Sequence, residues 1–398
     1  MAINIQNILS DNAKSMRRSA IRDLLSVANR PEVISFAGGF PNPGTFPVDD
    51  LKLIMQEVLE VESTSALQYG PTEGNAKLRE ILAQRYRAQG LDITKNNILI
   101  TTSSQQAIDL TSRIFISPGD TIVCGLPSYL GALQAFWSYQ AKPIGVRKDE
   151  ELEAVVTALI ESGRRPKFIY TIPDFQNPSG VTMNMEQRRM VLEVAEKYDL
   201  LVIEDSPYRE IRFEGDPQPL LYSMNNERVM LFGTLSKTVL PGFRIGWIIA
   251  PEVIIDRLVV AKQSADLCTP VFDQAVAARY FEKGLFEKNL GKTIDLYKKK
   301  RDHMLSCFEK YMPEGVSWTR PEGGLFLFVA LPEGYDATEL FNVAIKEDVA
   351  FVIGEAFHCD GTGKNTMRIN FSFMDEEKTE EGVKRLSKAI GRMLNEGK

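Results

Sequence analysis

Histidine is the scarcest chemically active residue in this sequence. Only His303 and His358 occur among the 398 residues. A His-rich metal site therefore cannot be built, and a Ser-His-Asp or Cys-His system would have to use one of these two positions. Neither histidine belongs to a cluster with metal-ligand spacing, so no metal site is predicted. If the chain is an enzyme, its proton carrier is expected to be a lysine, a carboxylate or a tyrosine.

Cysteine is also sparse, and no two cysteines form a CxxC pair. Cys124, Cys268, Cys307 and Cys359 lie far apart, which argues against a disulfide framework or a zinc ribbon and favours a reducing cytoplasm. The N-terminus lacks the charged and apolar regions of a secretory signal. The uncharged stretch 121–141 is interrupted by glycine, proline and glutamine, so it predicts strand, turn and helix rather than a membrane span. These patterns predict a soluble cytoplasmic protein.

An excess of positive charge is missing as well. The chain has 47 basic and 53 acidic residues, a formal net charge of −6, and 44% hydrophobic residues. This balance leaves no basic stripe for a phosphate backbone, so nucleic acid is not an expected partner. The length and composition indicate a globular protein of two to three domains.

Short apolar runs alternate with helical patterns through the first two thirds of the chain. Five runs predict buried strands, at 97–101, 121–125, 167–171, 200–204 and 229–232. Helices are expected at 104–116, from Tyr129 onward and at 186–198. Strands separated by helices indicate βαβ units and a mostly parallel sheet that is covered on both faces.

The pattern changes after about residue 251. Long charged helices run to about Tyr311, and the basic run 298–301 is expected on a solvated helix face. Short strands at 316–318, 325–329 and 367–371 and a helix at 337–346 then predict a smaller α+β region.

Polar residues follow the predicted strands, where ligands bind in open α/β sheets. The segment 101–106, Thr-Thr-Ser-Ser-Gln-Gln, lies between a strand and a helix. Free backbone N–H groups and hydroxyls at a helix start suit a phosphate. Simple capping of the helix by Ser103 or Ser104 is the alternative explanation.

Lys237 closes the strand at 229–232 within the sequence Gly-Thr-Leu-Ser-Lys. A lysine among small residues at a strand end is partly desolvated, which lowers its pKa and makes it a nucleophile and a base. Arg244, in the following Pro-Gly-Phe-Arg-Ile-Gly-Trp, could clamp an anion beside Ser236. The alternative is an ordinary solvated lysine.

Two further loops carry a carboxylate, a phenol and an amide. Asp205 and Tyr208 are held together by a proline turn, where the carboxylate could pair with a cationic ring nitrogen; an Asx turn is the alternative. Asn177 is bracketed by Pro173 and Pro178, which either fixes an amide donor or is only turn chemistry.

Taken together, the loops offer a phosphate cradle, a Schiff-base lysine, an acid for a pyridinium and donors for a phenolic oxygen, as pyridoxal 5′-phosphate (PLP) requires. The sequence resembles a fold-type I PLP-dependent aminotransferase of the 2-aminoadipate, kynurenine and broad-range branch. The shared motifs keep the family's order: Ser-Phe-Ala-Gly-Gly-Phe-Pro-Asn-Pro at 35–43, Leu-Gln-Tyr-Gly-Pro-Thr-Glu-Gly at 67–74, Ser-Ser-Gln-Gln-Ala at 103–107, Leu-Pro-Ser-Tyr at 126–129, Phe-Gln-Asn-Pro-Ser-Gly at 175–180, Glu-Asp-Ser-Pro-Tyr-Arg at 204–209, Ser-Lys at 236–237, Pro-Gly-Phe-Arg-Ile-Gly-Trp at 241–247 and Met-Arg-Ile-Asn-Phe-Ser at 367–372.

The resemblance implies a role for each cofactor residue. Lys237 would be the Schiff-base lysine and proton shuttle, and Asp205 would pair with the pyridine nitrogen. The phenolic ring oxygen would be bound by Asn177 and Tyr208. The ring face would be covered by Tyr129, and the phosphate would be held by Ser103, Ser104, Gln105, Ser236 and Arg244. Relatives commonly have glycine where this chain has Ser103, so a serine is expected to fit only if the backbone there needs no positive φ.

The resemblance also implies substrate and subunit contacts. Tyr69 would reach the phosphate of a neighbouring subunit, which implies a homodimer with shared active sites. Arg368 would bind the substrate α-carboxylate beside Asn177 and the Gly39 backbone. In the strand 367–371, Arg368 lies on the polar face, which suits bidentate carboxylate recognition, with a surface salt bridge as the alternative. Arg22, on a predicted amphipathic helix, is a candidate partner for a distal substrate carboxylate or simply an exposed arginine.

The implied fold is α/β, PLP-dependent transferase fold type I, with a mostly parallel seven-stranded sheet in a large domain and a smaller α+β domain. The expected division is an N-terminal segment 1–45 that packs with the small domain and active site, a large PLP-binding domain 46–295 and a small domain 296–398.

The implied activity is a ping-pong transfer of the amino group of an L-amino acid to a 2-oxo acid, with 2-oxoglutarate expected by analogy. The donor would be of the 2-aminoadipate, aromatic or branched/aliphatic type. A PLP-dependent β-lyase and a non-catalytic amine-sensing protein remain alternatives. A nucleotide-binding enzyme is not expected, because the segment 361–364 lacks Walker spacing.

Overall fold

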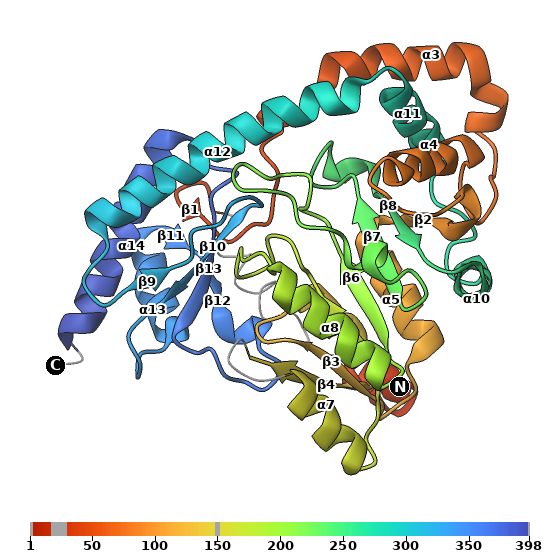
Figure 1. Ribbon diagram of the computed structural model, residues 1–398. Helices are drawn as coiled ribbons and strands as arrows, with labels where there is room; N and C mark the ends of the chain where they lie inside the picture. Colours follow the sequence, from red (N-terminus) through yellow and green to blue (C-terminus); the bar gives the residue numbers. More distant parts are fainter. Residues whose placement is uncertain (1–2, 17–29, 148–151, 397–398) are drawn as a thin grey trace.

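The computed structural model describes residues 3–16, 30–147 and 152–396 (Figure 1). A seven-stranded sheet lies at the centre of the larger part of the molecule, in the order β2-β8-β7-β6-β5-β3-β4. Its strands are β2 (Ile98–Thr102), β3 (Thr121–Gly125), β4 (Lys142–Val146), β5 (Pro166–Thr171), β6 (Leu201–Asp205), β7 (Val229–Thr234) and β8 (Ile245–Ile249). Within this sheet β8 runs antiparallel to both neighbours and the other pairs are parallel, so the predicted mostly parallel sheet is confirmed.

The strands are apolar on both faces because helices cover both sides of the sheet. Alternate residues of β5 enter two separate hydrophobic clusters: Phe168 and Tyr170 face one, and Ile169 faces the other. The first side is covered by α5 (Ser103–Phe115), α6 (Leu130–Ser138) and α10 (Glu252–Gln263). The second side is covered by α4 (Ala76–Arg87), α7 (Leu152–Glu161), α8 (Met185–Lys197) and α11 (Val271–Glu282).

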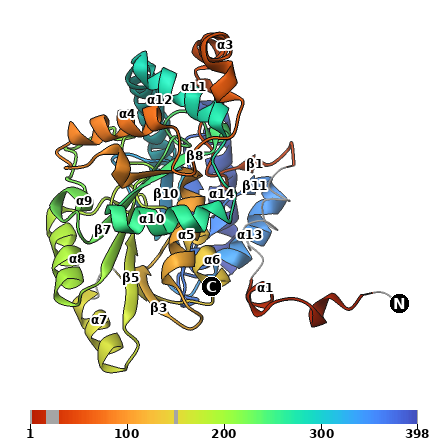
Figure 2. The same ribbon diagram turned by 90° about the vertical axis from the view of Figure 1, so that its right-hand side faces the viewer.

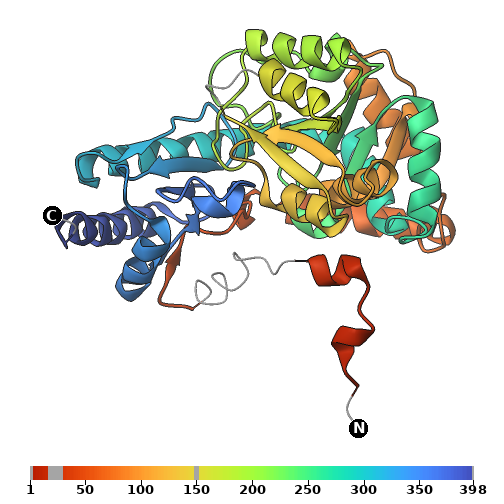
Figure 3. The same ribbon diagram turned by 90° about the horizontal axis from the view of Figure 1, so that it is seen from below.

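Local sequence signals explain where several of these helices begin. The side chain of Asn184 accepts from the backbone of Gln187, whose own side chain accepts in return, and this capping box starts α8. At the start of α4 the side chain of Asn75 accepts from the backbone N–H groups of Lys77 and Leu78. Among the described residues, the α-helices α1 (Asp11–Ser15), α3 (Val48–Ala66) and the short α9 (Leu221–Met224) also lie outside the small part. Figures 2 and 3 show residues 3–10, which precede α1, extending away from the body of the molecule.

A second, four-stranded antiparallel sheet organises the smaller part, in the order β12-β13-β10-β9. Its strands are β9 (Ser317–Trp318), β10 (Phe326–Ala330), β12 (Val352–Ile353) and β13 (Thr366–Asn370), and the helices α13 (Ala337–Ala344) and α14 (Glu376–Glu396) accompany it. The short strands β1 (Ile34–Ser35) and β11 (Val349–Ala350) pair in parallel. The segment that contains β1 therefore lies beside the smaller part, although it precedes the large sheet in the sequence. The long helix α12 (Leu285–Tyr311) joins the two parts and packs against α14 (Figure 1).

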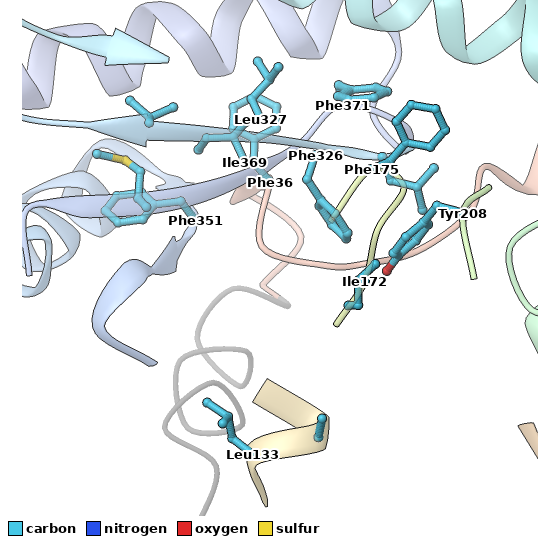
Figure 4. Close-up of a cluster of buried hydrophobic side chains, with 14 of the residues drawn as sticks. Phe36, Leu133, Ile172, Phe175, Tyr208, Phe326, Leu327, Phe351, Ile369 and Phe371 are labelled. Carbon is cyan, nitrogen blue, oxygen red and sulfur yellow. The ribbon is translucent and has the colours of Figure 1, made fainter. Parts of the chain in front are cut away.

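One hydrophobic cluster is continuous across the two parts. Figure 4 shows Leu327 and Ile369 of the small sheet on one side and Phe175 and Tyr208, from loops of the larger part, on the other, with Phe326 between them. This shared core fixes the small sheet against the strand-end loops of the large sheet. None of the helices in the described parts of the chain is long and apolar enough to cross a membrane.

The basic run 298–301 corrects one expectation. Arg301 is only 3% exposed, and its guanidinium donates to the carbonyl of Pro321 and to Glu214 at 2.7 Å. Successive helical residues turn by about 100°, so Arg301 faces the loop before β10 while Lys299 stays exposed. The run is therefore not a uniformly solvated face. Strands β4 and β8 have no counterpart among the predicted strands.

Candidate active site

The carboxyl ends of β3, β5, β6 and β7 meet at one edge of the large sheet, and polar residues lie just beyond them. Asp205 is the last residue of β6, and Lys237 follows β7 closely. Asn177 lies in the loop after β5, and Tyr129 lies in the turn after β3. This order of strands gathers a carboxylate, an amine, an amide and an aromatic ring where open α/β sheets bind ligands.

Lys237 is partly buried and faces a backbone carbonyl. Its Nζ donates to the oxygen of Gly39 at 2.8 Å. Burial lowers the pKa of Lys237 to about 8, and the positive charges of Arg368 and Arg244 act in the same direction. A sizeable fraction of the amine is therefore neutral near physiological pH, as a nucleophile or base requires.

Asp205 is 2% exposed, and its two oxygens have different surroundings. Oδ2 accepts from the hydroxyl of Tyr170 at 2.7 Å, whereas Oδ1 has no hydrogen-bond partner among the described residues. Burial raises the pKa of Asp205 to about 7, and the bond from Tyr170 opposes that rise. Tyr170 is absent from the residues predicted from sequence, since it lies inside the apolar run of β5 and belongs to no loop motif.

Arg368 is buried at 6% exposure, which removes the surface salt bridge as an explanation. Its Nη1 donates to Oδ1 of Asn177 at 2.9 Å, and its Nη2 donates to the carbonyl of Ala37 at 2.8 Å. The guanidinium lies over the ring of Phe326 at 4.2 Å. Burial lowers the pKa of Arg368 to about 10. The group remains a cation at neutral pH and is held for contact with an anion.

Asn177 and Tyr208 form a second contact beside this arginine. The Nδ2 of Asn177 donates to the hydroxyl of Tyr208 at 3.4 Å, and both side chains are buried. The ring of Tyr208 packs edge-on against Phe326. Burial raises the pKa of Tyr208, so the phenol stays protonated and able to donate.

Hydroxyl groups gather at the start of α5. Ser103 and Ser236 have their Oγ atoms 3.2 Å apart, and Ser236 also accepts from Thr234 at 3.0 Å. The Oγ of Ser104 is buried without a partner among the described residues. The N-cap of α5 is Thr102, which makes no side-chain cap bond, so capping does not explain these serines. The arrangement suits an anion at the helix start.

Ser103 contradicts the expectation that a serine fits only without a positive φ. Its φ is +68°, in the left-handed region. Neighbouring contacts hold this conformation: Thr101 Oγ1 donates to the Ser103 carbonyl at 3.0 Å, and Thr102 Oγ1 donates to Asp266 at 3.0 Å. Gly246 packs so closely on Ser103 that an added Cβ would lie 2.6 Å from its carbonyl carbon. The surrounding structure therefore imposes the conformation on the serine.

Gln105 and Tyr129 line a cavity next to Arg368. The Tyr129 hydroxyl donates to Gln105 Oε1 at 3.3 Å, and Gln105 Nε2 donates to the Gly131 carbonyl at 2.9 Å. Arg244 is exposed, with φ +53°. A cavity of about 250 Å³ opens here, lined by Gln105, Tyr129, Leu130, Gly131, Gln134, Phe357 and Arg368.

Two predicted residues are not part of these contacts. Tyr69 is 80% exposed, and its backbone N–H donates to Gln68 Oε1 at 2.9 Å. A hollow of about 490 Å³ beside it is lined by its own loop and by residues of α3, α4 and α11. Arg22 lies outside the described residues.

The unpartnered polar atoms test whether PLP fits. Asp205 Oδ1, Ser104 Oγ and Arg368 Nε are buried without partners in the described parts of the chain. They supply a carboxylate for a ring nitrogen, a hydroxyl for a phosphate and an N–H for a substrate carboxylate, around a lysine with a lowered pKa. This donor set fits PLP.

The two histidines lie in other contacts. The ring of His303 lies 2.9 Å from the Glu376 carbonyl, and that of His358 lies 2.8 Å from the Gly354 carbonyl. No group of three or more His, Cys, Asp or Glu residues that could hold a metal ion occurs among residues 3–16, 30–147 and 152–396.

The chain is similar to known proteins in both sequence and fold. Residues 32–386 match the family model for aminotransferase class I and II. Aromatic-amino-acid aminotransferase 1 of Thermococcus litoralis is 46% identical over 396 residues, which cover 98% of this chain and 95% of that protein. The 2-aminoadipate transaminase of Thermus thermophilus is 36% identical over 389 residues, 96% of each protein. The crystal structure of Pyrococcus horikoshii kynurenine aminotransferase with PMP, KYN as substrates and KYA as products superposes with a TM-score of 0.94 at 44% identity, over 98% of both chains.

Proposed function

The chain belongs to the class I and II aminotransferases, and from that premise we propose that Lys237, Asp205 and Arg368 carry its chemistry. The enzyme transfers an amino group between an amino acid and a 2-oxo acid with PLP as cofactor. The relatives do not favour a β-lyase or a non-catalytic amine sensor. The observation that carries the assignment of residues is Lys237, just after β7: its amine donates to the carbonyl of Gly39, and burial lowers its pKa.

The chain's own groups can be given specific tasks. PLP, when bound, supplies a cationic ring that accepts the electrons of the substrate Cα–H bond. In this proposal Lys237 takes the proton from the substrate α-carbon and later returns it, because its pKa of about 8 lets it hold and release a proton near neutrality. Asp205 Oδ1 holds a proton at the ring nitrogen.

Binding and orientation fall to the remaining polar groups. Arg368 binds the substrate α-carboxylate, with Asn177 fixing the guanidinium plane through the 2.9 Å bond. Asn177 and Tyr208 together bind the phenolic oxygen. The ring face is covered by Tyr129, the substrate is flanked by Gly39, and the phosphate is held by Ser103, Ser104, Gln105, Ser236 and Arg244.

We propose that the functional unit is a homodimer with shared sites. Large apolar side chains on and after α3 are exposed in the single chain: Leu53 at 68%, Val61 at 66% and Leu67 at 67%. Tyr69 follows directly, and in a dimer it reaches the phosphate of the partner's site. The proposed division is a segment 1–45, a large domain 46–295 and a small domain 296–398. The pairing of β1 with β11 supports the packing of the first segment with the small domain. The four unpaired cysteines support a cytoplasmic location.

A subunit-mixing experiment tests the shared site. Tyr69→Ala and Lys237→Ala are each expected to be nearly inactive alone. A mixed dimer recovers one intact site, made of Lys237 from one subunit and Tyr69 from the other, so a random mixture should regain about a quarter of wild-type activity. A mixture as inactive as the single variants would overturn the shared site.

Substrate range is the remaining part of the proposal. The donor is an L-amino acid of 2-aminoadipate, aromatic or branched type, the acceptor is 2-oxoglutarate, and Arg22 recognises a distal carboxylate. Purified holoenzyme should show a visible chromophore and transaminate these donors with 2-oxoglutarate. Arg22→Ala should lower the rate on 2-aminoadipate relative to leucine; an unchanged ratio would remove Arg22 from the substrate site.

A further inference from the structure

Tyr170 is placed by the strand register to act on Asp205. In the parallel pair of β5 and β6, Tyr170 lies opposite Ile203. Side chains two residues apart on a strand point to the same face, so Asp205 shares the face of Tyr170 one strand away. The Tyr170 hydroxyl accordingly donates to Asp205 Oδ2 at 2.7 Å, within a buried environment.

The ring of Tyr170 is fixed by aromatic packing. It is 1% exposed and meets Phe136 edge-on, with ring centroids 5.5 Å apart and an interplanar angle of 77°. Phe136 also packs on Phe168, at 5.6 Å. These contacts leave the hydroxyl aimed at one acceptor. Burial, together with the charge of Asp205, raises the pKa of Tyr170 well above its ordinary value, so the phenol keeps its proton and remains the donor.

The hydrogen bond matters because a buried carboxylate competes for protons. Desolvation raises the proton affinity of Asp205, which is why its pKa lies near 7. A carboxyl that holds its own proton cannot keep a neighbouring ring nitrogen protonated. Donation from Tyr170 stabilises the anionic form of Asp205 and shifts the balance toward the nitrogen. The free Oδ1 is the atom available to face that nitrogen.

We propose that Tyr170 is a positioning residue that acts through Asp205 to keep one proton on the ring nitrogen of bound PLP rather than on the carboxyl group. The inference rests on the proposed role of Asp205. In this arrangement no histidine is needed to support Asp205. A tyrosine of the adjacent strand donates to Oδ2, which leaves Oδ1 for the ring nitrogen.

The test is Tyr170→Phe, compared with Tyr280→Phe as a matched control. Both changes remove one buried hydroxyl, but the Tyr280 hydroxyl has no partner among the described residues. Each holoenzyme is loaded with PLP labelled with ¹⁵N in the ring, and the ¹⁵N chemical shift reports whether the nitrogen carries a proton. Tyr170→Phe should move this shift toward the neutral-pyridine value and lower kcat about tenfold, with KM little changed. Tyr280→Phe should change neither.

Two further variants separate the possible failures. Phe136→Leu keeps the hydroxyl but loosens its ring packing, and it should give a smaller shift in the same direction even if Tyr170→Phe fails to fold. If Tyr170→Phe lowers thermal stability but keeps the wild-type ¹⁵N shift and kcat at saturating PLP, the inference is wrong. If Asp205→Ala also keeps the wild-type shift, then Asp205 does not pair with the ring nitrogen, and the proposed role of Asp205 fails together with the inference.

Discussion

Two buried or partly buried lysines of this chain have very different hydrogen-bond partners. Lys262, in α10, is fully buried, and its Nζ donates to both oxygens of Asp266, at 2.7 and 2.9 Å, and to Gln106 at 2.8 Å. Lys237 donates to a neutral carbonyl and lies near the positive charge of Arg368. A carboxylate partner stabilises the charged form of a lysine and takes up its N–H donors. A neutral carbonyl stabilises the charge less, so the amine loses its proton more easily. The first lysine serves the fold, and the second is available for chemistry.

The largest expected effect comes from removing the available amine. Lys237→Ala should lower turnover by roughly a thousandfold, because in the proposed function the same group is both nucleophile and proton carrier. The visible absorbance of the lysine-bound cofactor should disappear as well. Steady-state rates and absorbance spectra measure both. Turnover at the wild-type level would refute the contrast between the two lysines.

Removing the carboxylate from the paired lysine should affect stability rather than chemistry. Asp266→Ala leaves Lys262 buried without its counter-charge and should lower the free energy of unfolding by about 3 kcal/mol. Lys262→Met is the matched control: it removes the cation together with its need for a partner, so it should destabilise less. Urea denaturation of the three proteins measures the differences. Equal stabilities for Asp266→Ala and wild type would show that the pair contributes nothing.

Lys237, whose hydrogen-bond acceptor is a neutral carbonyl, should show a pH-dependent effect on stability. The folded-state pKa of Lys237, about 8, lies below its ordinary value of 10.5. The native protein therefore binds fewer protons than the unfolded chain between these values, so the destabilising effect of the buried cation is fully present below pH 8 and is relieved as the pH rises toward 10.5.

In the cofactor-free protein, Lys237→Met should therefore raise stability at pH 7 by about 2 kcal/mol. That is less than the whole pKa difference implies, because the side chain is only partly buried. The gain over wild type should shrink between pH 8 and 10.5. A gain that does not depend on pH would mean that packing, not the buried cation, is responsible.

The smallest effect concerns Ser103, next to the Thr102 that the Lys262 and Asp266 network anchors. Ser103→Gly should relieve the left-handed backbone but lose the contact with Ser236, for a net gain of about 0.5 kcal/mol. Ser103→Ala keeps the strain, loses the contact and should be less stable than wild type. Thermal unfolding orders the three proteins; Ser103→Gly below Ser103→Ala would disprove the strain.

Periodic apolar patterns predicted most of the large sheet, with strand ends correct to within one or two residues. The run 245–249 has no predicted strand because it directly follows the Pro-Gly-Phe-Arg segment and is joined to β7 without an α-helix, which breaks the βαβ pattern. The pairing of Ile34 with Val349 could not be foreseen, because a two-residue strand carries no periodicity.

Site residues in loop motifs could be predicted from the sequence, whereas one site residue inside a strand could not. Residues in loop motifs, such as Lys237 and Asn177, could be found from local sequence. Tyr170 could not, because its meaning depends on the register between β5 and β6. One signal was available: a polar hydroxyl within an otherwise apolar buried run needs a partner. The left-handed Ser103 was equally hidden, since long-range contacts impose it.

The contacts of the segment 34–42 depend on the order in which the chain is synthesised. Its partner is synthesised much later: the carbonyl of Ala37 accepts a hydrogen bond from Arg368, which lies 331 residues further along the chain. At a synthesis rate of roughly 5–20 residues per second, that interval is on the order of tens of seconds. A nascent chain contains all the described strands of the large sheet, and Lys237, well before it contains Arg368. Under the proposed function, the chain can bind a substrate carboxylate only after residue 368 has been synthesised.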